Sequence, residues 1–354
     1  MTTSLRIAII GAGYWGPNLA RNFRSSPDWT LAAICDKDAD RAQRVAEQVG
    51  GASVLTDIEE ALADDAIDAV AIATPARTHH ALVTAALEAG KHVVVEKPLA
   101  DDRALGGMMV RTAAERGLVL MADHTYCYTP AVQKIRELVA EGVLGDILFI
   151  DSVRINLGLI QPDVDVFWDL APHDLSILDF IIPGGLRPHS VSAQGADPLH
   201  SGKACVGYLT IPFGDGAIAH VHVNWLSPTK IRKMVIGGTK RTLVWDDLNP
   251  QQRLSIYDRG VDIERQSAAT AERKASTVSY RLGDTWSPAL PEREALSLMA
   301  AEFAGAIRDG RAPLTDGGSG LRVLSVLDAA AVSLRAAGAA VPLILTEPEL
   351  EVVA

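Results

Sequence analysis

Short apolar segments alternate with helical patterns over the first third of the chain. Continuous apolar runs, the form taken by strands buried on both faces, lie at 5–10, 30–35, 67–73, 91–96 and 117–122. Helical stretches at about 78–89 and 101–116 lie between the later runs, and Gly90 follows the first of these as a C-terminal cap. This alternation at short spacing predicts a parallel sheet with crossover helices.

The pattern changes near residue 125. The segment "TPAVQKIRELVAEGVLGD" predicts one helix, with Pro130 in its first turn. From about residue 146, alternating segments separated by Gly, Pro, Asn and Asp predict a β-rich unit with an antiparallel sheet. Further helices are predicted at about 171–182, 291–308 and 318–337, and a polar surface loop at 265–290. We therefore expect two domains, at 1–124 and 125–354, with the option that 318–337 packs back on the first.

Composition narrows the class of protein. The chain has 354 residues, of which 48% are hydrophobic, enough for about two domains of ~150 residues. A formal charge of -11 argues against nucleic acid as a partner, although a local pocket can still bind a small anion. Three scattered cysteines (Cys35, Cys127, Cys205) fit a reducing cytoplasm. The N-terminus lacks the features of a signal peptide, and no apolar run approaches the ~20 residues of a membrane span.

A glycine-rich turn follows the first predicted strand. Gly11, Gly13 and Gly16 form G-x-G-x-x-G between a strand and a helix, where the glycines allow a tight turn, close approach of a pyrophosphate and close helix packing. Asp36 follows the second strand, at the position where a carboxylate accepts hydrogen bonds from the ribose hydroxyls. A carboxylate repels a 2′-phosphate, so the sequence favours NAD over NADP. The other candidate cofactor contacts near this turn are Tyr14, Trp15 and Arg41. Alternatively, Lys37 and Arg41 are exposed charged residues at the start of a helix.

The sequence Glu96-Lys97-Pro98 stands at the carboxyl end of a buried strand, which is where ligands bind in open α/β sheets. Alone, the pair is equally consistent with a surface ion pair, and the proline with a fixed turn or a cis peptide. Together, "GAGYWG", "ATPARTHH", "AGKHVVVEKPLA" and a later D-x-x-x-H resemble the Gfo/Idh/MocA family of sugar and polyol dehydrogenases over nearly the whole chain.

The resemblance implies that residues 1–124 form a dinucleotide-binding Rossmann domain, a doubly wound parallel sheet. It implies that residues 125–354 form a substrate-binding and oligomerisation domain, an α+β unit whose large open antiparallel sheet forms dimers or tetramers. It implies that Lys97 lies beside the nicotinamide and the reacting hydroxyl, with Glu96 near the cofactor. It also implies that Thr74, Pro75 and His79 line the nicotinamide half of the site. Many relatives carry an arginine where this chain has Cys127, so the contact of that arginine is absent here or is supplied by another residue.

The stretch "FWDLAPHDLSI" holds Asp169, His173 and Asp174. Three interpretations compete: the polar start of a helix beginning at Asp169 or Pro172, a metal site, and an acid/base site. No further ligands are identifiable by spacing, so no metal is predicted. The resemblance places His173 near the substrate hydroxyl as the proton acceptor, with Asp169 close by, and leaves Asp174 as a residue of the helix start.

The segment from Val153 to Leu178 resembles the branch that acts on nucleotide-linked sugars, including UDP-N-acetylglucosamine-type 3-dehydrogenases. Arg154 and Asn156 share one face of a predicted strand and either contact a sugar or diphosphate or are exposed polar residues. Trp168 either stacks on a sugar or fills core, with core favoured. The expected substrate is a nucleotide sugar oxidised at a ring hydroxyl, at C3. The alternatives are a free sugar, sugar phosphate or inositol, and, as a different class, a non-catalytic NAD-binding sensor.

Overall fold

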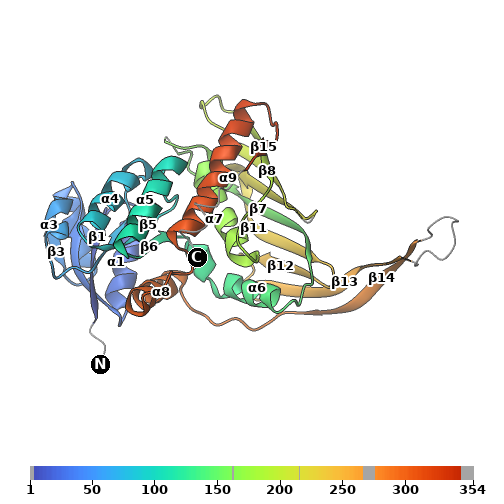
Figure 1. The fold of residues 1–354 in the computed structure, drawn as a ribbon, viewed down its shortest axis with the longest axis horizontal. Helices are drawn as coiled ribbons and strands as arrows, with labels where there is room; N and C mark the ends of the chain where they lie inside the picture. Colours follow the sequence, from blue (N-terminus) through green and yellow to red (C-terminus); the bar gives the residue numbers. More distant parts are fainter. Residues whose placement is uncertain (1–3, 162, 215, 266–275, 344–354) are drawn as a thin grey trace.

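The computed structural model describes residues 4–161, 163–214, 216–265 and 276–343, and Figure 1 shows its ribbon. Six parallel strands form the first sheet, in the order β3-β2-β1-β4-β5-β6. The strands are β1 (Leu5–Ile10), β2 (Trp29–Cys35), β3 (Ser53–Leu55), β4 (Ala69–Ile72), β5 (His92–Glu96) and β6 (Leu120–Asp123). Ile7, Ala8 and Ile9 are fully buried, as expected of a strand covered on both faces. The strand order reverses between β1 and β4, and ligands bind outside the carboxyl ends at such a point.

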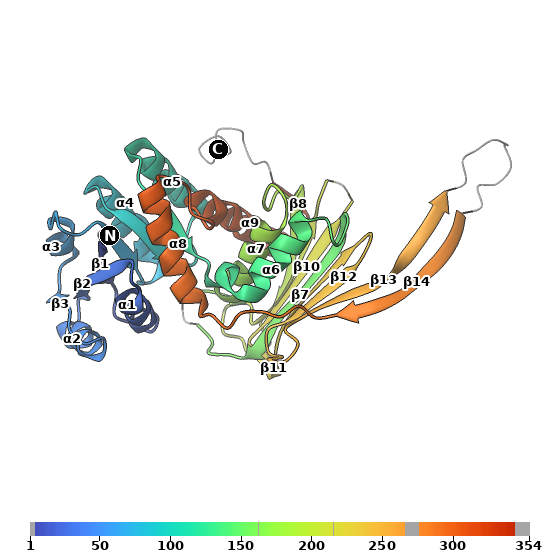
Figure 2. The ribbon, with the colours of Figure 1, turned by 90° about the horizontal axis from the view of Figure 1, so that it is seen from below.

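Helices cover both faces of this sheet (Figure 2). They are α1 (Gly16–Ser25), α2 (Ala39–Gln48), α3 (Ile58–Leu62), η1 (Ala76–Thr78), α4 (His79–Glu88) and α5 (Arg103–Arg116). Asp38, Asp57 and Asp102 each precede a helix and accept a backbone N–H from its first turn, which fixes where that helix begins. The parallel sheet with crossover helices expected from the alternation is confirmed, and with it the Rossmann fold that the resemblance implies.

Nine strands form the second sheet, in the order β14-β13-β12-β11-β7-β10-β9-β8-β15. Their bounds are β7 (Ile147–Leu157), β8 (Ser190–Ala196), β9 (Val206–Pro212), β10 (Ile218–Asn224), β11 (Leu226–Gly238), β12 (Thr242–Asp246), β13 (Leu254–Arg265), β14 (Ser276–Trp286) and β15 (Val341–Pro342). The open sheet expected from the sequence is confirmed with one difference: β10 pairs with β7 in parallel, so the sheet is mixed.

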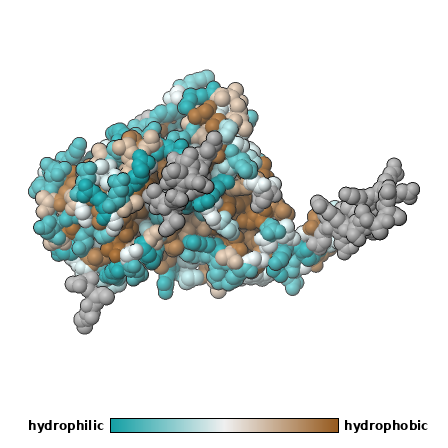
Figure 3. Space-filling model, in the orientation of Figure 1, coloured by the Kyte–Doolittle hydropathy of each residue, from teal (hydrophilic) through white to brown (hydrophobic). Residues whose placement is uncertain are grey.

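One face of the second sheet is covered and the other is not. On β9, Leu209 and Ile211 point to one face of the sheet and are buried. Tyr208, which points to the other face, is 53% exposed. Tyr208 stacks on His222 of β10 with ring centroids 4.4 Å apart, and His220 on the same strand pairs with Asp151. Figure 3 shows the opposite side of the molecule, on which α7 and α9 lie, and hydrophobic surface is visible there beside the extended β13–β14 hairpin.

The remaining helices connect the two sheets (Figure 1). They are η2 (Thr125–Tyr128), α6 (Pro130–Ala140), α7 (Val166–Ile181), α8 (Ala295–Asp309) and α9 (Gly317–Arg335). Helix α9 contacts strand β6 of the first sheet and helix α5, which covers that sheet. It also contacts strand β8 of the second sheet and helix α7. Helix α8 packs on α1, and its Phe303 stacks on Trp29 at the start of β2 with centroids 5.3 Å apart. The C-terminal helices therefore contact the six-stranded unit, and the domain boundary near residue 124 stays a prediction.

Two expectations about elements were wrong. Helix α7 begins at Val166 rather than near residue 171, because Asp165 caps it by accepting the N–H groups of Phe167 and Trp168, and Pro172 lies inside it. The loop expected at 265–290 contains strand β14 at Ser276–Trp286, which pairs with β13; residues 266–275 lie outside the described residues. The sequence did not indicate β14, because its side chains from Ser279 to Trp286 are exposed or half-buried, so no buried apolar alternation marks the strand.

Helix α9 is long and apolar enough to span a membrane by length and composition. Of its apolar window, 72% is buried inside the fold, which is typical of a core helix. The rest of the described residues contain no second helix of this kind.

Candidate active site

The glycine-rich turn has the shape that a dinucleotide requires. Gly11 has a positive φ of +100°, and a Cβ there would lie 2.8 Å from the carbonyl oxygen of Ala73. A Cβ at Gly16 would lie within 2.1 Å of the carbonyl oxygen of Gly11, so α1 approaches the turn more closely than any side chain allows. A Cβ at Gly13 would meet nothing within 4 Å, which leaves its backbone open to a pyrophosphate. These residues fit the cofactor that the turn predicts.

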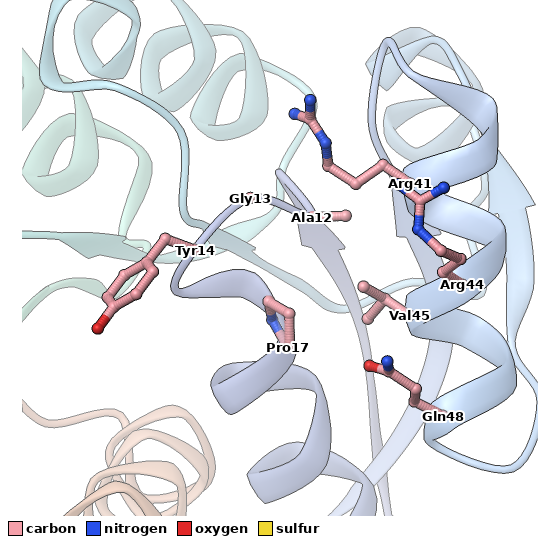
Figure 4. Close-up of a pocket in the computed structure, with 8 residues that line it drawn as sticks. All are labelled: Ala12, Gly13, Tyr14, Pro17, Arg41, Arg44, Val45 and Gln48. Atoms are coloured by element: carbon pink, nitrogen blue, oxygen red, sulfur yellow. The ribbon is translucent and has the colours of Figure 1, made fainter.

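A cavity of about 530 Å³ lies between this turn and α2 (Figure 4). It is lined by Ala12, Gly13, Tyr14, Pro17, Arg41, Arg44, Val45 and Gln48. The side chain of Tyr14 points away from α2 and is 94% exposed. The space is bounded by the turn on one side and by polar side chains of α2 on the other, which suits the adenosine half of a dinucleotide.

Asp36 anchors the edge of this cavity at the end of β2. Its Oδ2 accepts the N–H of Ala12 at 2.8 Å, and its Oδ1 accepts the N–H of Asp38 at 2.9 Å. The Arg41 guanidinium lies 3.7 Å from Asp36 and 3.4 Å from Asp38. The carboxylate therefore faces the glycine-rich turn, and Arg41 is held by two carboxylates rather than being a free charge.

His79 joins two loops at the carboxyl ends of β4 and β5. Its Nε2 lies 2.9 Å from the carbonyl oxygen of Thr74, and its Nδ1 lies 2.9 Å from that of Pro98. The ring is fully buried, and burial lowers its pKa. Thr74 contacts Thr78 through the two hydroxyls, 2.7 Å apart, and Pro75 precedes η1. His79 thus fixes the Thr74-Pro75 turn against the Lys97-Pro98 peptide, which is cis.

Glu96 lies beside a second carboxyl group rather than in an ion pair with Lys97. It is directly opposite Asp123 in the β5–β6 register, and burial, followed by Asp123, raises the pKa of Glu96 well above its usual range. Asp123 accepts hydrogen bonds from Trp15 Nε1 at 3.2 Å and from the Thr125 hydroxyl at 2.7 Å. Trp15 therefore contacts Asp123, and the environment of Glu96 favours the protonated form of its carboxyl group.

Lys97 connects the first sheet to α7. Its Nζ donates to the backbone oxygen of Asp169 at 2.8 Å and lies 3.4 Å from Asp169 Oδ1. The other carboxylate oxygen, Oδ2, accepts the indole N–H of Trp225 at 3.0 Å. The side chains of Lys97 and Asp169 are about one-fifth exposed, at 20% and 21%. Residues 72 positions apart in sequence thus form one polar group.

His173 lies one turn after Asp169 on α7, so both side chains share a face. Its ring packs edge-on against Tyr126 with centroids 5.1 Å apart. Its Nδ1 is buried and has no hydrogen-bond partner among the described residues. Burial, followed by the charges of Lys97, Arg154 and other nearby cations, holds the pKa of His173 well below its usual range. The imidazole is therefore neutral and has a nitrogen free to accept a proton.

Asp174 is not a residue of the helix start, as the sequence suggested. It is 2% exposed and forms a two-pronged ion pair with Arg154, with Nε to Oδ2 at 2.6 Å and Nη2 to Oδ1 at 3.2 Å. The Ser152 hydroxyl adds a third hydrogen bond at 2.8 Å. Arg154 is therefore buried and committed to Asp174, and the interpretation of it as an exposed strand residue was wrong. Asn156 and Trp168 are partly buried, and Trp168 packs against the core.

Sequence reasoning missed several residues of this site: Asp123, His124, Tyr126, Trp225 and Arg232. Tyr126 is the most central, because its ring contacts both His173 and Arg154. The available signal was position: Asp123, His124 and Tyr126 follow directly from β6, a strand whose carboxyl end borders the ligand edge. Cys127 beside them is buried, and its thiol contacts the backbone oxygen of Ser176 at 3.4 Å. Among the described residues, no group of three or more His, Cys, Asp or Glu side chains is placed to hold a metal ion.

Comparison with known proteins agrees with this geometry. Residues 5–124 match a family model described as "Oxidoreductase family, NAD-binding Rossmann fold", and residues 132–244 match the "GFO/IDH/MocA C-terminal domain". The UDP-N-acetylglucosamine 3-dehydrogenase of Acidithiobacillus ferrooxidans is 29% identical over 336 residues, covering 94% of this chain and 97% of that protein. A crystal form of that enzyme superposes with a TM-score of 0.79 at 27% identity, covering 95% of this chain and 99% of the other.

A second relative is more similar over a shorter region. The D-glucoside 3-dehydrogenase of Escherichia coli is 40% identical over 218 residues, which is 58% of this chain and 62% of that protein. Both matched domains, the strand orders and the glycine-rich turn lead to the same conclusion: the chain belongs to the Gfo/Idh/MocA family of oxidoreductases, with an NAD-binding Rossmann fold.

Proposed function

We propose that this protein is an NAD-dependent dehydrogenase that oxidises a ring hydroxyl, at C3, of a nucleotide-linked sugar such as a UDP-N-acetylhexosamine or its uronic acid. The observation that carries the proposal is the contact of Lys97 with Asp169, which brings the end of β5 next to α7, with His173 one turn further on. A hydroxyl placed between Lys97 and His173 would meet one cation and one neutral base. The full-length similarity to the 3-dehydrogenase supports the choice of substrate.

The side chains of this chain divide the chemistry between them. His173 accepts the hydroxyl proton as a general base, and Lys97 donates a hydrogen bond to the same oxygen and stabilises its developing negative charge. Asp169 holds the Lys97 ammonium in place, and Trp225 fixes the carboxylate of Asp169. NAD, when bound, would supply the nicotinamide ring as the acceptor of the hydride from the carbon that bears this hydroxyl. Because burial makes His173 a weak base, the reaction depends on Lys97 to lower the pKa of the alcohol.

The remaining candidate residues support cofactor binding. Gly11, Gly13 and Gly16 shape the pyrophosphate site, while Thr74, Pro75 and His79 position the nicotinamide end together with Glu96. Asp36 is the basis for preferring NAD, since its carboxylate faces the turn where a 2′-phosphate would approach. The exposed face of the second sheet, which carries Tyr208, supports assembly into a homodimer or homotetramer through that sheet.

A second candidate function is oxidation of a free sugar, sugar phosphate or inositol. It is supported by the shorter but closer similarity to the D-glucoside dehydrogenase. A non-catalytic NAD-binding sensor is less well supported, because ligand sensing needs no free base beside a lysine.

The direct test is formation of NADH, followed at 340 nm, with UDP-N-acetylglucosamine, UDP-glucuronic acid, glucose, glucose 6-phosphate and myo-inositol. Lys97→Met and His173→Asn are expected to lower kcat by about 100- to 10,000-fold, since each removes a group that acts on the reacting hydroxyl. The matched controls Lys134→Met, at a half-buried position of α6, and His200→Asn, in an exposed loop, should keep wild-type rates.

The same assay with NADP in place of NAD tests cofactor preference, and a lower KM with a higher kcat for NADP would refute it. Near-wild-type rates in both site variants would refute the assignment of Lys97 and His173. If the protein binds NAD but oxidises none of these sugars, the result would favour the non-catalytic NAD-binding sensor.

A further inference from the structure

Tyr126 lies between the proposed base and two arginines. Its ring packs edge-on against His173 at 5.1 Å, and the guanidinium carbons of Arg154 and Arg232 lie 4.3 Å and 5.7 Å from its centroid. The two arginines stand directly opposite each other on neighbouring strands, Arg154 on β7 and Arg232 on β11. One aromatic ring therefore separates the reacting centre from both cations.

The charge of Arg154 is already compensated. Asp174 pairs with it through two hydrogen bonds, and the side chains are 3% and 2% exposed. Removing either partner from this pair would leave a buried charge, so Arg154 is committed to the structure and cannot turn toward a ligand. Lys97 is likewise held by Asp169. Arg154 therefore has a structural role, and Lys97 is held at the position proposed above for the reacting hydroxyl.

Arg232 differs from both. Its side chain is 30% exposed, and its side-chain hydrogen bond within the described residues is a single long one, from Nη1 to Asp247 Oδ2 at 3.5 Å. A guanidinium carries five N–H donors in a flat fork, and this contact uses one of them near the limiting distance. The other donors have no side-chain hydrogen-bond partner among the described residues, and the guanidinium lies 5.7 Å from the ring of Tyr126, which packs against His173.

We propose that Arg232 is the residue that selects an anionic substrate, by pairing with a phosphate or carboxylate oxygen carried by the sugar. The proposal rests on the dehydrogenase function proposed above and names the charge of its substrate. A planar guanidinium binds either oxyanion through two parallel hydrogen bonds, which gives orientation as well as affinity. An acidic protein of net charge -11 repels anions at long range, so it needs a local cation of this kind to hold one.

The position of Arg232 also determines which part of the substrate it would contact. It lies one ring away from His173, so it would touch a substituent of the sugar rather than the hydroxyl that reacts. Losing such a contact weakens binding of the substrate and of its transition state alike, which raises KM more than it lowers kcat. Arg232 is thus a specificity residue, and its positive charge determines which sugars bind.

The test compares Arg232→Gln and Arg232→Lys with the wild type on three substrates: UDP-N-acetylglucosamine, which carries a diphosphate; glucuronic acid, which carries a carboxylate; and glucose, which is neutral. Arg232→Gln should raise KM about 10- to 100-fold for the anionic substrate and leave glucose unchanged, since a charge-assisted pair is lost. The anionic substrate whose KM rises in Arg232→Gln shows whether Arg232 binds the diphosphate or the carboxylate. Arg232→Lys should restore part of the affinity.

The control is Lys233→Gln, which removes one positive charge from the next residue of β11, on the opposite face of the strand. Equal KM changes for charged and neutral sugars, or the same effect in Lys233→Gln, would overturn the role of Arg232. If the wild type oxidises none of the three sugars, the proposed function fails on its own. Calorimetric binding of UDP and of glucuronate to the wild type and to Arg232→Gln then decides the role of Arg232: unchanged or undetectable binding of both anions overturns it.

Discussion

Gly13 and Gly16 occupy the same turn but are required for different reasons. Gly16 is needed by the fold, because a Cβ there would lie within 2.1 Å of the Gly11 carbonyl oxygen. Gly13 has open space around it and no such steric requirement within the protein. The sequence motif alone cannot separate these roles, since both positions are simply glycine in G-x-G-x-x-G.

We therefore predict that Gly13→Ala folds with a thermal midpoint close to the wild type but loses at least about tenfold in NAD affinity, because the new methyl group occupies the approach of the pyrophosphate. Gly16→Ala should lower the midpoint of the cofactor-free protein, because a steric clash of this kind typically costs about 1–3 kcal/mol. Thermal unfolding without cofactor and calorimetric titration with NAD measure the two effects. Wild-type NAD affinity in Gly13→Ala would contradict this division.

Between elements, the buried pair of Arg154 and Asp174 connects β7 to α7, the helix that carries Asp169 and His173. Three hydrogen bonds, including that from Ser152, fix the rotation of α7 over the sheet. A pair of this kind is poor evidence for added stability compared with an apolar pair, but breaking it leaves one charge buried. Its main effect is to determine where the face of α7 that carries Asp169 and His173 points.

Asp174→Asn is predicted to lower the free energy of unfolding by about 3–5 kcal/mol, because the Arg154 charge stays buried without a counterion. The double variant Arg154→Met with Asp174→Leu should recover much of that loss, since no charge then remains. Urea unfolding at pH 7.5 measures both. The control Asp151→Asn, at an exposed position of β7, should change the free energy by less than about 0.5 kcal/mol. A loss in Asp174→Asn as small as in this control would show that the charge is not buried in solution.

At the scale of the whole molecule, buried histidines link stability to pH. His124 follows β6, is 1% exposed, and neither ring nitrogen has a hydrogen-bond partner among the described residues. Burial lowers its pKa to about 4, from an ordinary value of 6.5. Below pH 6.5 the unfolded chain binds this proton before the folded chain does. The contribution of His124 to stability is therefore full above pH 6.5, declines between pH 6.5 and 4, and is absent below that range.

The wild type is expected to lose roughly 2–3 kcal/mol through His124 alone between pH 7.5 and 4.5. His124→Phe keeps a ring of similar shape without a titrating group, so its stability should fall by that much less over the same range. Urea unfolding at the two pH values measures the difference. His200→Asn, at an exposed loop position, should follow the wild-type pH dependence. Parallel pH curves for His124→Phe and the wild type would show that His124 takes up its proton without cost to the fold.

Much of the architecture follows from local pattern. The buried runs of β1, β4 and β5 and the glycine-rich turn predict the parallel sheet and its ligand edge, because both depend on residues close together in sequence. The start of α7 was misplaced because Asp165, its cap, lies before the segment in which the helical pattern is visible. Strand β14 was missed because its pairing with β13, rather than apolar alternation, defines it.

The sequence by itself determined the class of protein: a dinucleotide-binding fold, its family, and the pairing of a lysine at a strand end with a D-x-x-x-H segment. Only the tertiary structure decided what each polar residue contacts. Lys97 meets Asp169, Glu96 lies beside Asp123, Asp174 pairs with Arg154, and Arg232 keeps free donors. The physical reason is that the charge and exposure of a side chain depend on residues from distant strands and helices, which local periodicity does not record.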